Sequence, residues 1–158
     1  MIDKDLRELL LAFNAHGVEY LVVGGYAVGV HAEPRSTKDL DIFIRADGKN
    51  SEAVFRALGA YGAPLEGLTS AAFRDEPASV FQIGTPPSRI DILQSIDGVA
   101  FEDAWQSRLE GLVDGEIPTH VISSEHLIQN KLTTGRAQDI ADVEAIRSAA
   151  LQRPEKKL

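Results

Sequence analysis

The sequence predicts an α+β fold of two layers, in which a mixed β-sheet is flanked by helices. Helical and strand patterns both occur, but they do not alternate strictly as they do in a doubly wound α/β fold. Residues 19–23 are apolar and β-branched, and residues 39–44 and 89–93 alternate polar with apolar side chains, as strands do. We interpret residues 1–158 as a single domain, which their number allows.

The N-terminal half is predicted to mix helices with strands. Asp3 fits the cap of the first helix, Gly17 ends that helix, and Gly24-Gly25 turn the chain from the first strand into the second helix. In order, we expect a helix over 3–15, a strand over 19–23, a helix over 26–32, a loop over 32–38, a strand over 39–44 and a helix over 51–58.

The C-terminal half is predicted to end in helices. Asp114-Gly115 is a strong hairpin-turn dipeptide, and Pro118 weakens the second hairpin arm as a central strand. Helices begin at about residue 123, where Ser123 or Ser124 is the cap. In order, we expect loops with about one helical turn over 59–78, paired strands over 79–84 and 89–93, a helix over 101–107, a hairpin within 109–122, helices over 125–134 and 136–151, and a frayed tail over 152–158.

Composition limits the kinds of function. The chain has no cysteine, which excludes disulfides, thiolate metal sites and a thiol nucleophile. No apolar run approaches the ~20 residues that cross a bilayer, and the N-terminal segment lacks a signal-peptide pattern, so we expect a cytoplasmic protein without a membrane partner. The net charge of −8 disfavours unaided RNA binding, and a polyanionic ligand would need a metal ion or a partner.

Two predicted strands carry acids on one face. Alternate side chains of a strand share a face, so Asp39, Asp41 and Phe43 point one way and Leu40 points the other. The Cα atoms of the first two acids lie roughly 6.5–7 Å apart. Asp91 has the same setting and joins them if the strands pair in register. Such carboxylates suit one Mg²⁺ ion or two, and the alternative is a solvated strand face.

Gly24-Gly25 lies where a predicted strand meets a helix, and glycines there let backbone N–H groups approach an anion closely. The spacing fits neither a Walker loop nor a dinucleotide-binding fingerprint, and a plain tight turn is the simpler alternative. The order of strand, glycine pair, short helix, basic turn and Asp-x-Asp strand is more specific than any of its parts.

With these motifs the sequence resembles the nucleotidyltransferase superfamily that includes DNA polymerase β and kanamycin nucleotidyltransferase. The matching motifs are Gly24-Gly25, Asp39-Leu40-Asp41 and Asp91. Residues 34–44 and 127–146 are similar to the abortive-infection, toxin–antitoxin branch of this superfamily, and the matching stretches span most of residues 19–146. The resemblance implies transfer of a nucleoside monophosphate from a nucleoside triphosphate to a hydroxyl, with Mg²⁺ as the cofactor.

The resemblance also implies roles for individual residues. Asp39 and Asp41 would bind the metal ions, and Asp91 would complete the metal site and act as, or orient, the base for the acceptor hydroxyl. The nucleotide-binding residues would be Gly24, Gly25, Arg35, Thr37 and Lys131. Arg136, Asp139 and Asp142 would form a structural clasp beside the site. From helical spacing alone, Lys131 would be solvated, and Arg136 with Asp139 would be a surface pair. We expect His31 to be packed or hydrogen-bonded rather than catalytic.

Two departures from the superfamily leave alternatives open. The hydroxyl residue found beside the first glycine in the smaller minimal nucleotidyltransferases is missing, and the chain is short beside many abortive-infection toxins. The acceptor is therefore open between a tRNA end, a protein hydroxyl and a small molecule, and an antitoxin or another protein partner is expected. The main alternative is a weak or inactive binding module in a two-protein complex, and a metal-dependent phosphohydrolase ranks last.

Overall fold

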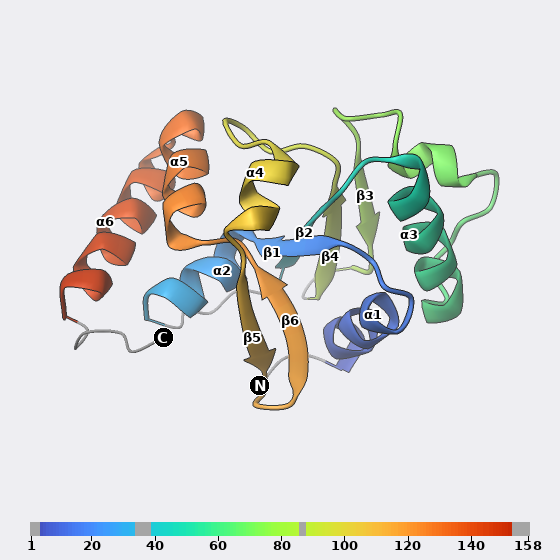
Figure 1. The fold of residues 1–158 in the computed structure, drawn as a ribbon, viewed down its shortest axis with the longest axis horizontal. Helices are drawn as coiled ribbons and strands as arrows, with labels where there is room; N and C mark the ends of the chain where they lie inside the picture. Colours follow the sequence, from blue (N-terminus) through green and yellow to red (C-terminus); the bar gives the residue numbers. More distant parts are fainter. Residues whose placement is uncertain (1–3, 34–38, 86–87, 153–158) are drawn as a thin grey trace.

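The protein forms a six-stranded mixed sheet with helices packed around it (Figure 1). The computed structural model describes residues 4–33, 39–85 and 88–152. The strand order is β3-β4-β2-β1-β6-β5, in which β1–β6 and β2–β4 are parallel and the other neighbours antiparallel. The predicted α+β class is thereby confirmed. The elements are α1 (Lys4–Ala15), β1 (Tyr20–Val23), α2 (Gly24–His31), β2 (Asp39–Ile44), α3 (Gly48–Tyr61), the 3₁₀ turn η1 (Ser70–Phe73), β3 (Val80–Ile83), β4 (Arg89–Leu93), α4 (Phe101–Gln106), β5 (Leu109–Val113), β6 (Ile117–Val121), α5 (Ser124–Thr134) and α6 (Ala137–Gln152).

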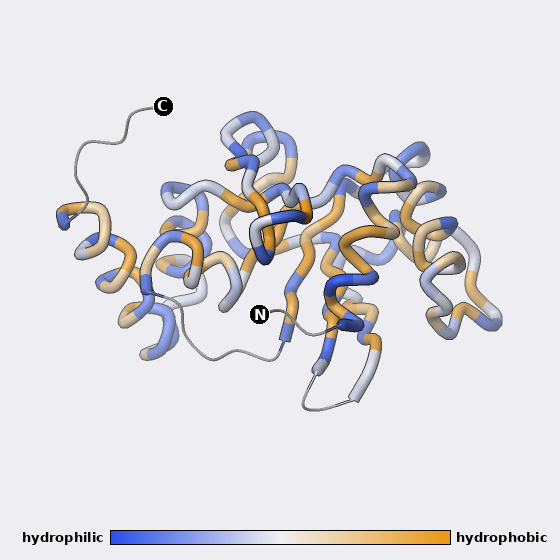
Figure 2. Tube along the Cα trace, turned by 90° about the horizontal axis from the view of Figure 1, so that it is seen from below, coloured by the Kyte–Doolittle hydropathy of each residue, from blue (hydrophilic) through white to orange (hydrophobic). Residues whose placement is uncertain are grey.

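Different helices cover the two faces at the centre of the sheet. The ring of Tyr20 on β1 lies 5.7 Å from Phe13 of α1. Phe43 of β2 lies 5.1 Å from Phe101 of α4 and points to the opposite face, because Tyr20 pairs with the next residue, Ile44. Hydrophobic segments gather in the middle of the molecule (Figure 2), while α2, α5 and α6 lie together at one side (Figure 1).

Two helices differ in length from the sequence prediction. α3 begins three residues earlier than predicted, because the Asp47 side chain accepts a hydrogen bond from Asn50 N at 2.7 Å and caps the helix. It runs on to Tyr61 and stops at Gly62, whose φ of 98° is left-handed. α2 begins directly at Gly24 rather than after the glycine pair. The predicted loop region over 59–78 holds the end of α3 and the turn η1.

The predicted hairpin is confirmed, and its turn residues Asp114 and Gly115 both have positive φ. Pro118 lies in β6, which pairs along its length with the edge strand β5. The pairing of β6 with β1 is confined to its end, at Val22 and Val121. Pro118, which has no N–H to donate, is therefore kept out of the central pairing, as the sequence indicates.

The C-terminal helices begin and end within one residue of the predicted bounds. Ser123 caps α5 by accepting a hydrogen bond from His126 N at 3.2 Å, and the left-handed Gly135 separates α5 from α6. His31 is buried and its Nε2 lies 2.7 Å from the carbonyl oxygen of Ile122, so its predicted hydrogen-bonded role is confirmed. The predicted cap Asp3 and the tail residues 153–158 lie outside the described residues. None of the described helices has the length and apolar character needed to cross a membrane.

Candidate functional site

Strands β2 and β4 bring the three predicted acids together. The strands are parallel, and Asp41 is paired with Asp91 while Asp39 is paired with Arg89. Paired residues of a sheet point to the same face, so the three carboxylates lie on one face at the edge where β2 and β4 begin. The in-register arrangement that the sequence analysis required is thus present. We call Asp39, Asp41 and Asp91 the acid cluster.

Arg89 is a fourth member of this site, and the sequence analysis missed it. Its Nη2 lies 3.3 Å from Asp39 Oδ2, and its Nε lies 3.2 Å from Asp91 Oδ1. The signal was available, because Arg89 stands two residues before Asp91 and alternation in a strand places both on one face. One guanidinium therefore bridges two of the three carboxylates.

The pKa of Asp41 is raised by its position in the acid cluster. Burial, then the neighbouring carboxylates of Asp91 and Asp39, raise the pKa of Asp41 to about 7, and Arg89 offsets this only in part. Like charges this close repel unless a cation lies among them. Within the part of the chain that the structure describes, the cluster therefore holds more negative charge than Arg89 neutralises.

Gly24 explains how the glycine turn and the acid cluster fit together. Its φ is +66°, and a Cβ added there would overlap the carboxylate of Asp41, well inside van der Waals contact. Val23, the residue before α2, makes no side-chain cap, so the first turn of α2 adjoins the acid cluster without a capping side chain. The missing side chain of Gly24 thus leaves room for the Asp41 carboxylate. Phosphate binding by Gly24 and Gly25 remains a prediction.

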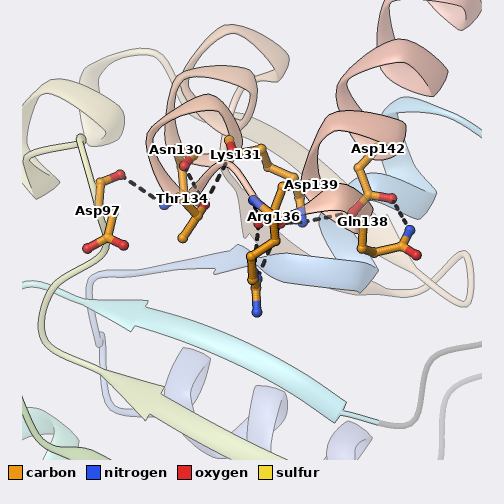
Figure 3. Close-up of polar contacts among 8 residues, drawn as sticks. All are labelled: Asp97, Asn130, Lys131, Thr134, Arg136, Gln138, Asp139 and Asp142. Atoms are coloured by element: carbon orange, nitrogen blue, oxygen red, sulfur yellow. Dashed lines mark hydrogen bonds and ion pairs between the residues drawn. The ribbon is translucent and has the colours of Figure 1, made fainter.

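A second charged group joins α5 to α6 (Figure 3). Lys131 Nζ lies 3.3 Å from Asp139 Oδ1 and 2.9 Å from Asp142 Oδ2, and all three side chains are at least nine-tenths buried. Arg136 adds an ion pair of 2.7 Å to Asp139 from the exposed side. We call Lys131, Arg136, Asp139 and Asp142 the C-terminal clasp.

The C-terminal clasp corrects two expectations from helical spacing. Lys131 is buried rather than solvated, because the two aspartates of α6 provide it with counter-charges. Asp139 is likewise buried rather than part of a surface pair. Its hydrogen bond from Arg136, and then the Lys131 ammonium, lower the pKa of Asp139 to about 2 against the effect of burial. Nucleotide binding by Lys131 remains a prediction, since its ammonium is engaged by both aspartates here.

The clasp is tied to the strand that carries Asp91. The loop after β4 presents the carbonyl oxygen of Asp97 to Asn130 Nδ2 at 2.9 Å. The next carbonyl, that of Gly98, accepts from Gln129 Nε2, and the Gly98 backbone packs against Thr133. α5 is thereby fixed to the segment that follows the acid cluster. The other predicted site residues, Arg35 and Thr37, lie outside the described residues.

The donor set suits Mg²⁺, which prefers hard oxygen ligands such as carboxylates. Asp91 Oδ1 is buried and accepts no hydrogen bond of good geometry, and its 3.2 Å contact with Arg89 Nε is an ion pair only. As the side chains lie, however, no three acidic or histidine residues among those the structure describes are arranged to hold a metal ion. In this arrangement Arg89 is ion-paired with both Asp39 and Asp91.

A family model matches most of this chain. The model of a family described as a nucleotidyltransferase of unknown function, DUF6036, matches residues 1–151. A search of curated proteins finds no match to this chain.

Solved structures of the same fold include two antibiotic-modifying enzymes. The lincosamide antibiotic adenylyltransferase LnuA, lincomycin-bound, has a TM-score of 0.58 at 19% identity, over 94% of this chain and 98% of that one. ANT(2″)-Ia in complex with adenylyl-2″-tobramycin has a TM-score of 0.61 at 14% identity, over 92% and 87%. An antigenic nucleotidyltransferase-like protein from Paracoccidioides brasiliensis has a TM-score of 0.53 at 16% identity, over 96% and 78%.

Proposed function

The chain belongs to this nucleotidyltransferase family, and on that premise we propose that it is an Mg²⁺-dependent enzyme that transfers a nucleoside monophosphate from a nucleoside triphosphate to a hydroxyl. The observation that carries the proposal is the in-register acid cluster beside the Gly24 turn. On a solvated strand face the acids would point into water. Here the Asp41 carboxylate instead occupies the space that a side chain at position 24 would fill.

The residues have distinct parts in the proposed reaction. Asp39 and Asp41 would hold Mg²⁺, which supplies charge neutralisation at the phosphates. Asp91 would complete the site and accept, or orient the base that accepts, the proton of the acceptor hydroxyl. The acceptor oxygen forms a bond to the α-phosphorus, the bond to the β-phosphate oxygen breaks, and pyrophosphate leaves with the electron pair. Gly24 and Gly25, at the start of α2, would lie against the phosphates.

We place a small molecule first among the acceptors. Two structural neighbours are described with lincomycin and with adenylyl-2″-tobramycin, and the net charge of −8 disfavours an RNA acceptor. A tRNA end or a protein hydroxyl, and a role with an antitoxin or in phage defence, are the alternatives that the resemblance to the abortive-infection branch supports.

A second candidate is a binding module with a weak or inactive site. Two observations favour it: Arg89 is ion-paired with Asp39 and Asp91, and the described residues include no group arranged to hold a metal ion. The missing hydroxyl beside the first glycine also favours it.

Label transfer from α-³²P nucleoside triphosphates distinguishes the two candidates. Wild type is incubated with Mg²⁺, each of the four ribonucleotides and separate pools of hydroxylated small molecules, tRNA and protein. We expect labelled product with one nucleotide and a loss of at least about 10³-fold in Asp39→Ala/Asp41→Ala, because metal and phosphate positioning supply most of the rate. Asp103→Asn, an exposed acid on α4, is the control and should keep full activity. Equal labelling in the double variant would contradict the proposal.

A further inference from the structure

The acid cluster contains a cation of its own, and we propose that Arg89 acts as a resident counter-ion that a divalent metal ion must displace from Asp91. The inference rests on the proposed function and names a regulatory residue of the same site. It concerns how the site is kept closed to a metal ion in the absence of nucleotide.

The geometry places the guanidinium where a metal ion would meet two of the three acids. Arg89 Nη2 lies 3.3 Å from Asp39 Oδ2 and 3.4 Å from Asp91 Oδ2, and Nε lies 3.2 Å from Asp91 Oδ1. Arg89 and Asp39 are register partners on the parallel strands β4 and β2. A cation held by both Asp39 and Asp91 and this guanidinium therefore compete for the same oxygens.

The ion pair between Arg89 Nε and Asp91 Oδ1 lacks an aligned hydrogen bond. Arg89 Nε and Asp91 Oδ1 are both buried, yet neither makes a hydrogen bond of good geometry despite their 3.2 Å separation. Buried polar atoms of this kind ordinarily find a hydrogen-bond partner. The contact of Arg89 Nε with Asp91 Oδ1 is therefore an ion pair without an aligned hydrogen bond, so a divalent cation that replaces it breaks no aligned hydrogen bond between these two atoms.

The partial exposure of the Arg89 side chain allows it to move away from Asp91. Its side chain is 34% exposed, against 12% for Asp91, and it stands at the first residue of β4. A triphosphate that arrives with its metal ion supplies new anionic oxygens, which a guanidinium binds well. Release of Arg89 would therefore couple loading of the metal ion to arrival of the nucleotide, and the free site would take a metal ion only weakly.

Titration with Mn²⁺ in the absence of nucleotide tests this proposal. Binding is followed by electron paramagnetic resonance of free Mn²⁺, and by the shift in melting temperature, in wild type, Arg89→Gln and Arg89→Lys. We expect Arg89→Gln to bind Mn²⁺ at least about tenfold more tightly than wild type, because a competing positive charge has been removed. Arg89→Lys should lie between them, since an ammonium keeps the charge but not the planar fork.

Two further variants assign the effect to the acid cluster. Arg74→Gln removes a half-buried arginine that pairs with Asp75 rather than with the acid cluster, and it should match wild type. Adding Asp41→Asn to Arg89→Gln should abolish the gained affinity. If Arg89→Gln fails to fold without metal, refolding by Mn²⁺ would support the proposal, and Arg89→Lys supplies the affinity comparison.

The outcomes separate the role of Arg89 from the proposed function. Equal Mn²⁺ affinity in wild type, Arg89→Gln and Arg89→Lys would overturn the role of Arg89 and leave the proposed function standing. No Mn²⁺ binding in any variant would also overturn the role of Arg89, because its removal would not have opened the site. The proposed function is decided separately, by label transfer in the presence of nucleotide.

Discussion

The acid cluster and the C-terminal clasp are two groups of charges with opposite electrostatic character. In the acid cluster three carboxylates face one arginine, and the pKa of Asp41 is raised to about 7 by burial and its acidic neighbours. In the clasp Lys131 and Arg136 converge on Asp139, and its pKa is lowered to about 2. Among the described residues, the clasp sets two acids against two bases, whereas the acid cluster sets three acids against one arginine. The clasp joins α5 to α6, and the proposed function assigns the excess negative charge of the acid cluster to a metal ion.

The largest effect on stability is expected at Lys131. Replacing it by alanine leaves Asp139 and Asp142 buried without their shared cation, and breaking a buried pair in this way costs about 3–5 kcal/mol. Denaturant unfolding of Lys131→Ala measures the loss. Lys49→Ala, an exposed lysine of α3, is the control and should stay within about 0.5 kcal/mol of wild type. A loss at Lys131 no larger than that of the control would show that the clasp contributes nothing.

A smaller loss is expected at Gly24, where the turn meets the acid cluster. Alanine at a φ of +66° is strained, and its Cβ would push against the Asp41 carboxylate, so we expect a loss of about 1–3 kcal/mol. Gly17 has the same φ but nothing within reach of an added Cβ, so Gly17→Ala isolates the backbone strain. Equal losses of unfolding free energy in Gly24→Ala and Gly17→Ala would show that the overlap with Asp41 does not destabilise the protein.

Asp41 predicts a pH dependence of stability in the metal-free protein. Between the unfolded pKa near 4 and the folded pKa of about 7, the folded state binds a proton that the unfolded state has released. Stability should therefore fall as the pH rises through this window and level off above it. Relative to Asp41→Asn in EDTA, wild type should lose stability from about pH 5 to about pH 8. A constant difference between the two proteins would contradict the raised pKa.

The smallest effect is expected at Arg136. Its side chain is 74% exposed, and exposed ion pairs contribute about 0–1 kcal/mol. Lys131 and the Arg136 backbone N–H would still serve Asp139 in Arg136→Gln. Its melting temperature should therefore drop by only about 0–4 °C. A loss as large as that of Lys131→Ala would mean that Arg136, not Lys131, holds the clasp.

Local sequence patterns predicted the fold and the acid cluster because their causes are local. Alternation in residues 39–44 and 89–93 placed the acids on one strand face, and Asp114-Gly115 fixed a hairpin. The clasp could not be predicted in this way. Burial of Lys131 depends on α6 packing against α5, and nothing in the helix itself shows that two aspartates will meet its ammonium.

Arg89 and the start of α3 were missed for a different reason. Alternation places Arg89 on the strand face of Asp91, but its bridge to Asp39 depends on the register of β4 against β2, which no local pattern gives. Gly48 is a poor helix former, and the cap by Asp47 outweighed it at the start of α3.

The central claim is that the acid cluster is a metal and nucleotide site, and thermal unfolding tests it most directly. Wild type and Asp39→Ala/Asp41→Ala are melted with Mg²⁺ and each of the four ribonucleoside triphosphates in turn. A ligand that binds only the folded state raises its melting temperature. We predict a rise with one triphosphate that requires Mg²⁺ and is absent from the double variant. No rise with any triphosphate, or an equal rise in the double variant, would contradict the claim and favour a binding module whose ligand is another protein.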